Sequence, residues 1–147
     1  MTPGQAGYSA TPLARKLGVN EGHRLLLVEA PPDWTVPDLP DGVIRRRSGS
    51  RLPDALDADI VIAFFTVAAR LEKVGPDLAR RLADAAALWV AWPRRAGGHD
   101  SDITDQVPRD VLLPIGVVDV KVAALDPDWS GLKFVWRLER RGARARR

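Results

Sequence analysis

Apolar residues along this chain gather into short runs that are bounded by glycine, proline and charged residues. The clearest runs lie within residues 24–29, 59–65 and 87–92. Runs of this length are typical of parallel strands that are buried on both faces of a sheet. A weaker run over residues 42–46 predicts a further strand near a sheet edge.

Helical periodicity marks residues 67–87, where apolar side chains recur every three or four positions. Gly75 and Pro76 interrupt this segment and predict two helices, with Pro76 at the first position of the second. Shorter helices are predicted after Thr11, ending at Gly18, and over residues 104–113. The chain therefore alternates strands and helices.

The last two strand-like runs differ from the others. Residues 117–125 and 132–138 are separated by only six residues, 126–131. A parallel crossover needs a dozen or more residues, so this pair is predicted to be an antiparallel hairpin. Lys121 and Lys133 lie on its two strands, and the sequence leaves their register open.

Length and composition fit one globular α/β domain over residues 11–139, between a flexible lead (1–10) and a basic flexible tail (140–147). The chain has 147 residues, is 46% hydrophobic and has no cysteine, which excludes disulfides and thiolate sites. Its longest apolar run falls far short of the roughly 20 residues of a membrane span. We expect a cytoplasmic protein without a membrane partner.

Positive charge is concentrated at the end of the chain. Residues 137–147 hold six arginines and one glutamate, a local charge of +5 that leaves −2 for the rest of the +3 total. Such a tail can attract nucleic acid. The favoured alternative is a solvated chain end, since residues 140–147 contain no aromatic side chain to stack on bases.

The order of these elements resembles class I methyltransferases. Residues 57–65 and 87–90 are similar to the fourth and fifth strands of that family, whereas its third strand has no counterpart here. The resemblance implies a doubly wound, mostly parallel sheet of about six strands with a C-terminal antiparallel hairpin and helices on both faces. In the family's numbering, the strand order would be 2-1-4-5-7-6.

The features that hold the cofactor in that family are missing from this sequence. A glycine-rich turn follows the family's first strand and passes close under adenosylmethionine. Here that place holds residues 29–34, in which Pro31 and Pro32 lack backbone N–H donors and no glycine is present. The family's acidic residue at the end of strand two is replaced by residues 45–47, all arginine. We therefore predict no cofactor.

The sequence is also similar to a small bacterial family catalogued as domain of unknown function 3052. The similar segments are residues 7–13, 16–18, 88–93, 118–122 and 129–133. The resemblance implies an intracellular bacterial protein and brings no established activity.

Candidate ligand-binding residues follow from the rule that open α/β sheets bind ligands at the carboxyl ends of their parallel strands. A tryptophan beside paired arginines would suit a small anionic or planar ligand. The alternative is that these tryptophans pack in the core or pin a turn while the arginines are solvated. No metal site is predicted, since the loop with His99 reads as a polar turn. The candidates are Asp33, Trp34, Thr66, Trp92, Arg94, Arg95, Trp129 and Lys133.

Three functions remain open from the sequence. The first is a non-catalytic binding or regulatory module on a degenerate methyltransferase-like scaffold, with a small anionic ligand or a protein partner. The second is a group-transfer enzyme that uses adenosylmethionine in an atypical way. The third is association with nucleic acid through the arginine-rich tail. Fold alone does not choose among them, because function resides in sites.

Overall fold

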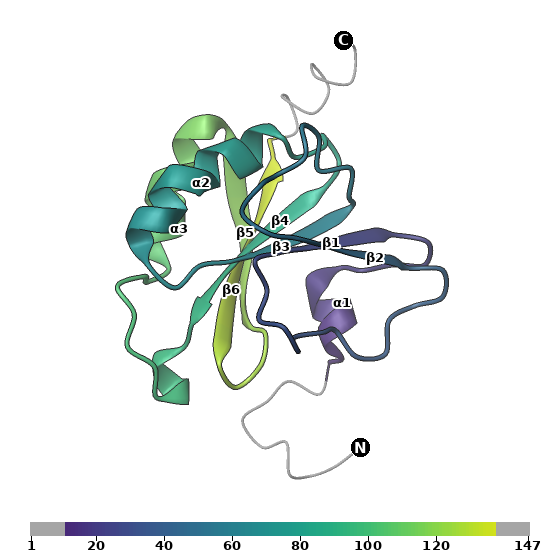
Figure 1. Ribbon diagram of the computed structural model, residues 1–147, viewed down its shortest axis with the longest axis horizontal. Helices are drawn as coiled ribbons and strands as arrows, with labels where there is room; N and C mark the ends of the chain where they lie inside the picture. Colours follow the sequence, from purple (N-terminus) through teal and green to yellow (C-terminus); the bar gives the residue numbers. More distant parts are fainter. Residues whose placement is uncertain (1–10, 138–147) are drawn as a thin grey trace.

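The computed structural model describes residues 11–137 (Figure 1). The predicted flexible lead (1–10) and basic tail (140–147) lie outside the described residues. No helix within residues 11–137 is long and apolar enough to cross a membrane.

The described chain forms a six-stranded sheet with the order β2-β1-β3-β4-β6-β5 (Figure 1). Strands β2, β1, β3 and β4 run parallel, and β6 is antiparallel to both β4 and β5. This order agrees with the prediction once the absent third strand is allowed for. The strands are β1 (Arg24–Val28), β2 (Ile44–Ser48), β3 (Ile60–Phe64), β4 (Ala87–Pro93), β5 (Val117–Ala124) and β6 (Trp129–Trp136).

Side chains from the central strands form two separate cores, one on each face of the sheet. All five residues of β3 are buried. Val61 and Ala63 belong to one core, whereas Ile60 and Ile62 belong to the other. Because successive strand residues point to opposite faces, an uninterrupted apolar run is required where both faces are covered.

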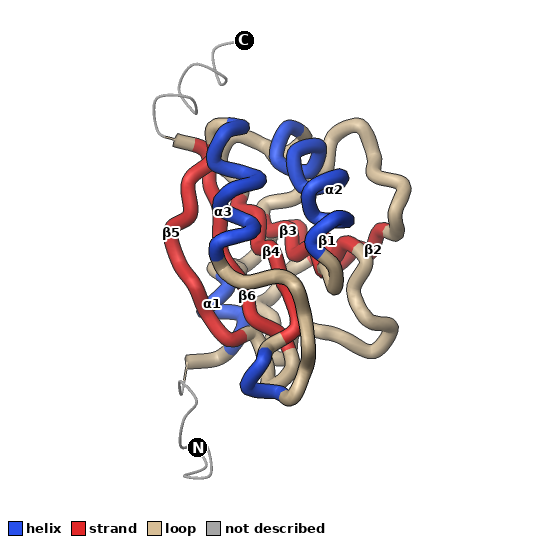
Figure 2. The backbone as a smooth tube through the Cα atoms, turned by 90° about the vertical axis from the view of Figure 1, so that its left-hand side faces the viewer, coloured by secondary structure: helices blue, strands red, loops and turns tan. Residues whose placement is uncertain are grey.

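The two faces are covered differently. Helices α2 (Ala68–Arg80) and α3 (Gln106–Leu112) lie side by side over one face (Figures 1 and 2). The other face receives the short helix α1 (Leu13–Leu17) together with the loop after β1, in which Trp34 and Val36 are buried. The predicted helical layer on both faces is therefore replaced on this second face by a five-residue helix and irregular chain.

The predicted break at Gly75 and Pro76 is wrong, because α2 runs through both residues. Gly75 is buried where α3 crosses, and a Cβ atom there would lie 3.2 Å from Val111 and 3.3 Å from Leu112. Glycine thus permits the close approach of α3. Pro76 has no N–H, so α2 lacks one helical hydrogen bond. Burial of the apolar face of α2 offsets the free-energy cost of that missing bond.

The C-terminal hairpin is antiparallel as predicted, but its second strand starts earlier. Trp129 already pairs with Pro93 of β4, so the turn is shorter than the predicted 126–131 segment. The Asp126 carboxylate accepts the backbone N–H groups of Asp128 and Trp129, each at 2.7 Å, which closes the turn. Lys121 and Lys133 lie opposite each other.

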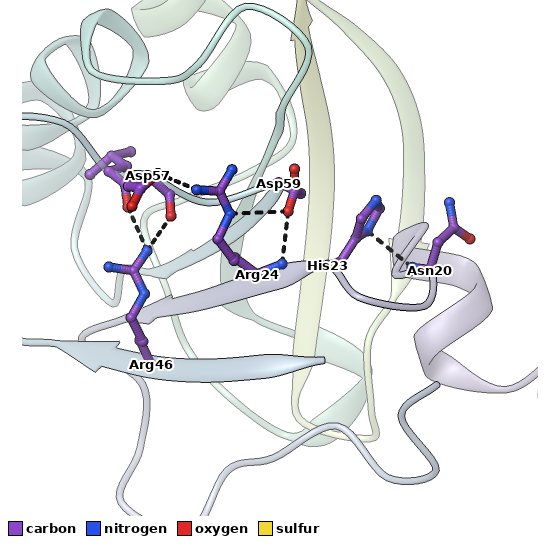
Figure 3. A network of polar contacts seen from close by, with 7 residues as sticks. Asn20, His23, Arg24, Arg46, Asp57 and Asp59 are labelled. Carbon is purple, nitrogen blue, oxygen red and sulfur yellow. Dashed lines mark hydrogen bonds and ion pairs between the residues drawn. The ribbon is translucent and has the colours of Figure 1, made fainter. Parts of the chain in front are cut away.

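Charged side chains tie together the strands at the amino-terminal end of the sheet (Figure 3). Asp59, just before β3, accepts a 2.8 Å hydrogen bond from the backbone N–H of Arg24. The Arg24 guanidinium pairs with Asp57 and contacts Asp59 at 3.5 Å. Arg46 of β2 donates to the backbone carbonyls of Leu56 and Asp57. The hydrogen bond from the Arg24 N–H lowers the pKa of Asp59.

Replacing Asp59 with asparagine removes this pH dependence. A carboxyl group whose pKa is lower in the folded protein stabilises it above the unfolded pKa, and that stabilisation is lost as pH falls through the folded value. We expect Asp59→Asn to cost about 1 kcal/mol at pH 7, a modest figure because the pair is partly exposed. The cost should shrink below about pH 4.

Urea unfolding at several pH values measures this difference. Asp54→Asn is the matched control, because the Asp54 side chain is fully exposed and lies 3.8 Å from Arg81. The control should change stability little at any pH. A difference between Asp59→Asn and wild type that stays constant from pH 7 to acid would contradict the assignment.

Candidate functional site

An open hollow of about 770 Å³ lies at the carboxyl ends of β3 and β4. It contains two of the predicted site residues, Thr66 and Arg95, both of which are exposed. The remaining lining comes from Val67 at the start of α2 and from the loop after β4. The lining residues are Thr66, Val67, Arg95, Gly98, His99, Asp100, Ser101 and Asp102.

The charges around this hollow are mixed. The Asp102 carboxylate accepts the N–H of Ala68 at 2.8 Å and so caps the amino terminus of α2. His99 Nε2 contacts the Asp128 carboxylate at 2.9 Å. With Asp100 and Asp102 both in the lining, the single arginine there does not create a cationic site.

Two predicted tryptophans pack beneath the rim of the sheet. Trp34 is 8% exposed, and its Nε1–H donates to the Asp126 carboxylate at 2.8 Å. Trp34 and Trp129 both meet Phe64 edge to face, with ring centroids 4.9 and 5.0 Å apart. These contacts join the loop after β1 to the C-terminal hairpin, which agrees with the alternative that the tryptophans pin the chain.

The other predicted residues occupy separate places. Trp92 is 6% exposed in the core beneath α2 and α3, in agreement with the core alternative. Arg94 donates to the Asp126 carbonyl oxygen at 3.2 Å and so holds the hairpin turn. Asp33 is exposed. Lys133 lies near the end of α1, where burial and neighbouring Lys121 lower its pKa. The structure therefore does not bring the eight candidates together.

The carboxyl ends of β1, β2 and β3 do not fit adenosylmethionine. The hollow between them, bordered by Val28, Ser50 and Phe64, has no room for a water molecule. Glu29 at its edge is paired with Arg70 at 2.9 Å. Adenosylmethionine would have to displace the packed side chains around this hollow. Pro31 and Pro32 could offer it no backbone N–H donor.

Two arginines that replace the expected acidic residue bind the protein's own backbone. Arg47 donates to the carbonyl oxygens of Pro31, at 3.2 Å, and of Trp34. Arg46 donates to the carbonyl oxygen of Leu56 at 2.7 Å. Both side chains therefore fasten loops to β2, a role that their positions in the sequence did not reveal.

Solved structures with the same arrangement of strands and helices are SAM-dependent methyltransferases. The fold is that of class I methyltransferases. A SAM-dependent methyltransferase from Aquifex aeolicus matches with a TM-score of 0.59 and 14% identity over 83% of this chain and 86% of that chain. A TehB-like SAM-dependent methyltransferase from Corynebacterium glutamicum matches with a TM-score of 0.53 and 12% identity over 90% and 91%.

The tRNA methyltransferase TrmK of B. subtilis also has this methyltransferase-like fold, with a TM-score of 0.54 and 12% identity over 85% of this chain and 64% of that one. At these identities, the likeness concerns the scaffold alone. No family model and no curated protein matches the sequence. The resemblance to domain of unknown function 3052 therefore stays a prediction.

Asp102 and Asp126 are the structurally important residues at this rim that the sequence analysis did not select. Each accepts backbone N–H groups, Asp102 at a helix start and Asp126 in a hairpin turn. The signal for Asp126 was present, because an aspartate that precedes Pro127 is typical of a turn. Asp102 gave no such signal, since it lies 34 residues after the helix position that it caps.

Proposed function

We propose that this protein is a non-catalytic binding or regulatory module on a methyltransferase-like scaffold. The observation that carries the proposal is the closed hollow at the carboxyl ends of β1, β2 and β3. A scaffold that keeps its sheet order but fills the place of the cofactor with its own side chains has no means of ordinary methyl transfer. Its ligand would be a small anion or a protein partner, and its location the cytoplasm.

Group transfer with an atypical use of adenosylmethionine is the competing function. It would need a place for the cofactor away from the closed hollow at the ends of β1, β2 and β3, and the open hollow beside Thr66, of about 770 Å³, is a candidate. That hollow is open to solvent, and its Asp102 carboxylate is already bound to the backbone N–H of Ala68. The non-catalytic function is therefore the better supported of the two.

Isothermal titration with adenosylmethionine tests the proposed function. We expect no binding tighter than about 1 mM, because two N–H donors are missing and the hollow is closed. Titration with S-adenosylhomocysteine should give the same result. Saturable one-to-one binding of either compound, or transfer of labelled methyl to any acceptor, would overturn the proposal.

Nucleic-acid association through the tail lies outside the described residues and stays a prediction. Deletion of residues 142–147 would remove three arginines. If the tail binds nucleic acid, this deletion should abolish salt-sensitive binding. Unchanged binding in a filter or fluorescence-anisotropy assay would exclude the tail as the contact.

A further inference from the structure

The connection between β1 and β2 leaves part of the sheet uncovered. Parallel neighbours are usually joined by an α-helix, yet residues 29–43 contain no helix. The chain instead returns across the sheet as a loop, with Trp34 and Val36 buried against it. Between this loop and the edge strand β2, a hollow of about 330 Å³ remains, which lies within the size range of small-ligand pockets.

The floor of this hollow is apolar, and one of its walls is cationic. Leu25 and Leu27 of β1 form the floor together with Val36, and all three are buried. The register pairs Leu25 with Arg45 and Leu27 with Arg47, which places both arginines on the same face of the sheet as these leucines. The lining contains no carboxylate.

The two arginines on this face have different roles. Arg47 holds the loop through the Pro31 and Trp34 carbonyl oxygens, and so builds the wall. Arg45 is exposed and makes no hydrogen bond or ion pair with any residue in the described range 11–137. Its guanidinium is therefore available to a ligand, whereas that of Arg46 is bound to backbone carbonyls near the start of β3.

The neighbouring charges make this hollow a better anion site than two larger hollows, one beside Thr66 and one of about 580 Å³ beside α1 that is lined by Glu21 and Asp38. The hollow beside Thr66 carries Asp100 and Asp102, and Asp102 already occupies the amino terminus of α2. In the hollow beside β2, every charged lining residue is an arginine. Guanidinium groups pair well with carboxylates, and the buried leucines provide a surface for an apolar body.

We propose that the hollow between β2 and the loop after β1 binds a small carboxylate with an apolar body. The carboxylate pairs with Arg45, and the body lies against Leu25, Leu27 and Val36. This inference rests on the proposed function and deepens it by naming a ligand class. It concerns the face of the sheet, away from the strand ends where adenosylmethionine would lie.

Octanoate is a suitable probe, and isothermal titration on the full chain measures its binding. We expect a dissociation constant at or below about 1 mM. Octan-1-ol has the same body without the charge, and acetate has the charge without the body. Each should bind at least about tenfold more weakly, since each lacks one of the two interactions.

Two variants locate the site. Arg45→Met keeps the apolar stem and removes the charge, and should weaken octanoate binding by about tenfold. Thr35→Trp places a bulky ring at an exposed lining position and should abolish binding without disturbing the core. Arg80→Met is the matched control, because Arg80 is an exposed arginine at the end of α2 on the other face. It should bind octanoate like wild type.

The outcomes separate this inference from the proposed function. Absence of octanoate binding, equal binding of octan-1-ol, or unchanged binding in both Arg45→Met and Thr35→Trp would overturn the assignment of this hollow. None of these results would introduce adenosylmethionine binding, so the proposed function would stand. Conversely, saturable adenosylmethionine binding that Thr35→Trp leaves unchanged would overturn the proposed function and leave this site intact.

Discussion

Replacing Trp89 with alanine should lower the free energy of unfolding by about 4 kcal/mol. Trp89 lies in the middle of β4 and is fully buried. Its ring fills the core between the sheet and α1, and its Nε1–H donates to the Leu17 carbonyl oxygen at 3.1 Å. The variant loses the buried ring and leaves the last carbonyl of α1 without this donor.

Urea unfolding measures the effect as a lower midpoint at an unchanged slope. Trp89→Phe is the control, because it keeps an aromatic ring and removes the N–H donor. It should cost about 1–2 kcal/mol from the lost hydrogen bond and the smaller ring. If Trp89→Ala cost no more than Trp89→Phe, packing of the ring would not be what holds α1 to the sheet.

Replacing Trp34 with alanine should cost about 3 kcal/mol and still produce no binding of adenosylmethionine. Trp34 packs edge to face on Phe64 and donates to Asp126, so that it joins the loop after β1 to the C-terminal hairpin. Removing it opens space near the rim. Pro31 and Pro32 remain, however, and the backbone N–H donors that a bound cofactor would need stay absent.

Thermal or urea unfolding gives the stability of the variant, and isothermal titration gives its affinity. Trp34→Phe is the control for the hydrogen bond, since it keeps a ring against Phe64 and leaves the Asp126 carboxylate without its donor. It should cost about 1 kcal/mol. Binding of adenosylmethionine to Trp34→Ala would mean that the tryptophan alone, and not the prolines, excludes the cofactor.

The residues that set the sheet order differ from the residues that fill the strand ends. The sheet order depends on the apolar strands, whereas the cofactor depends on one turn and on the residues at the end of the second strand. Replacing these with prolines and arginines leaves the buried runs of β3 and β4 untouched. The apolar strands that fix the sheet order are therefore separate from the residues at the strand ends, and also from the face beside β2 that we propose as a binding site.

The sequence by itself determined the strands, because apolar runs buried on both faces can be placed only inside a sheet. It also determined that the last two strands pair antiparallel, since six residues cannot cross a sheet. The sequence also showed that residues 29–34 differ from the glycine-rich turn that holds adenosylmethionine, because proline lacks a backbone N–H in any conformation.

Tertiary structure decided what depends on contacts between distant segments. Helix α2 continues through Pro76, and Gly75 lets α3 pack closely against it, a contact that local sequence does not contain. Trp34 is buried because Phe64 and Asp126 contact it from other elements. Arg45 and Arg47 share a wall because strand register assigns alternate residues to one face, and register is fixed only when the sheet forms.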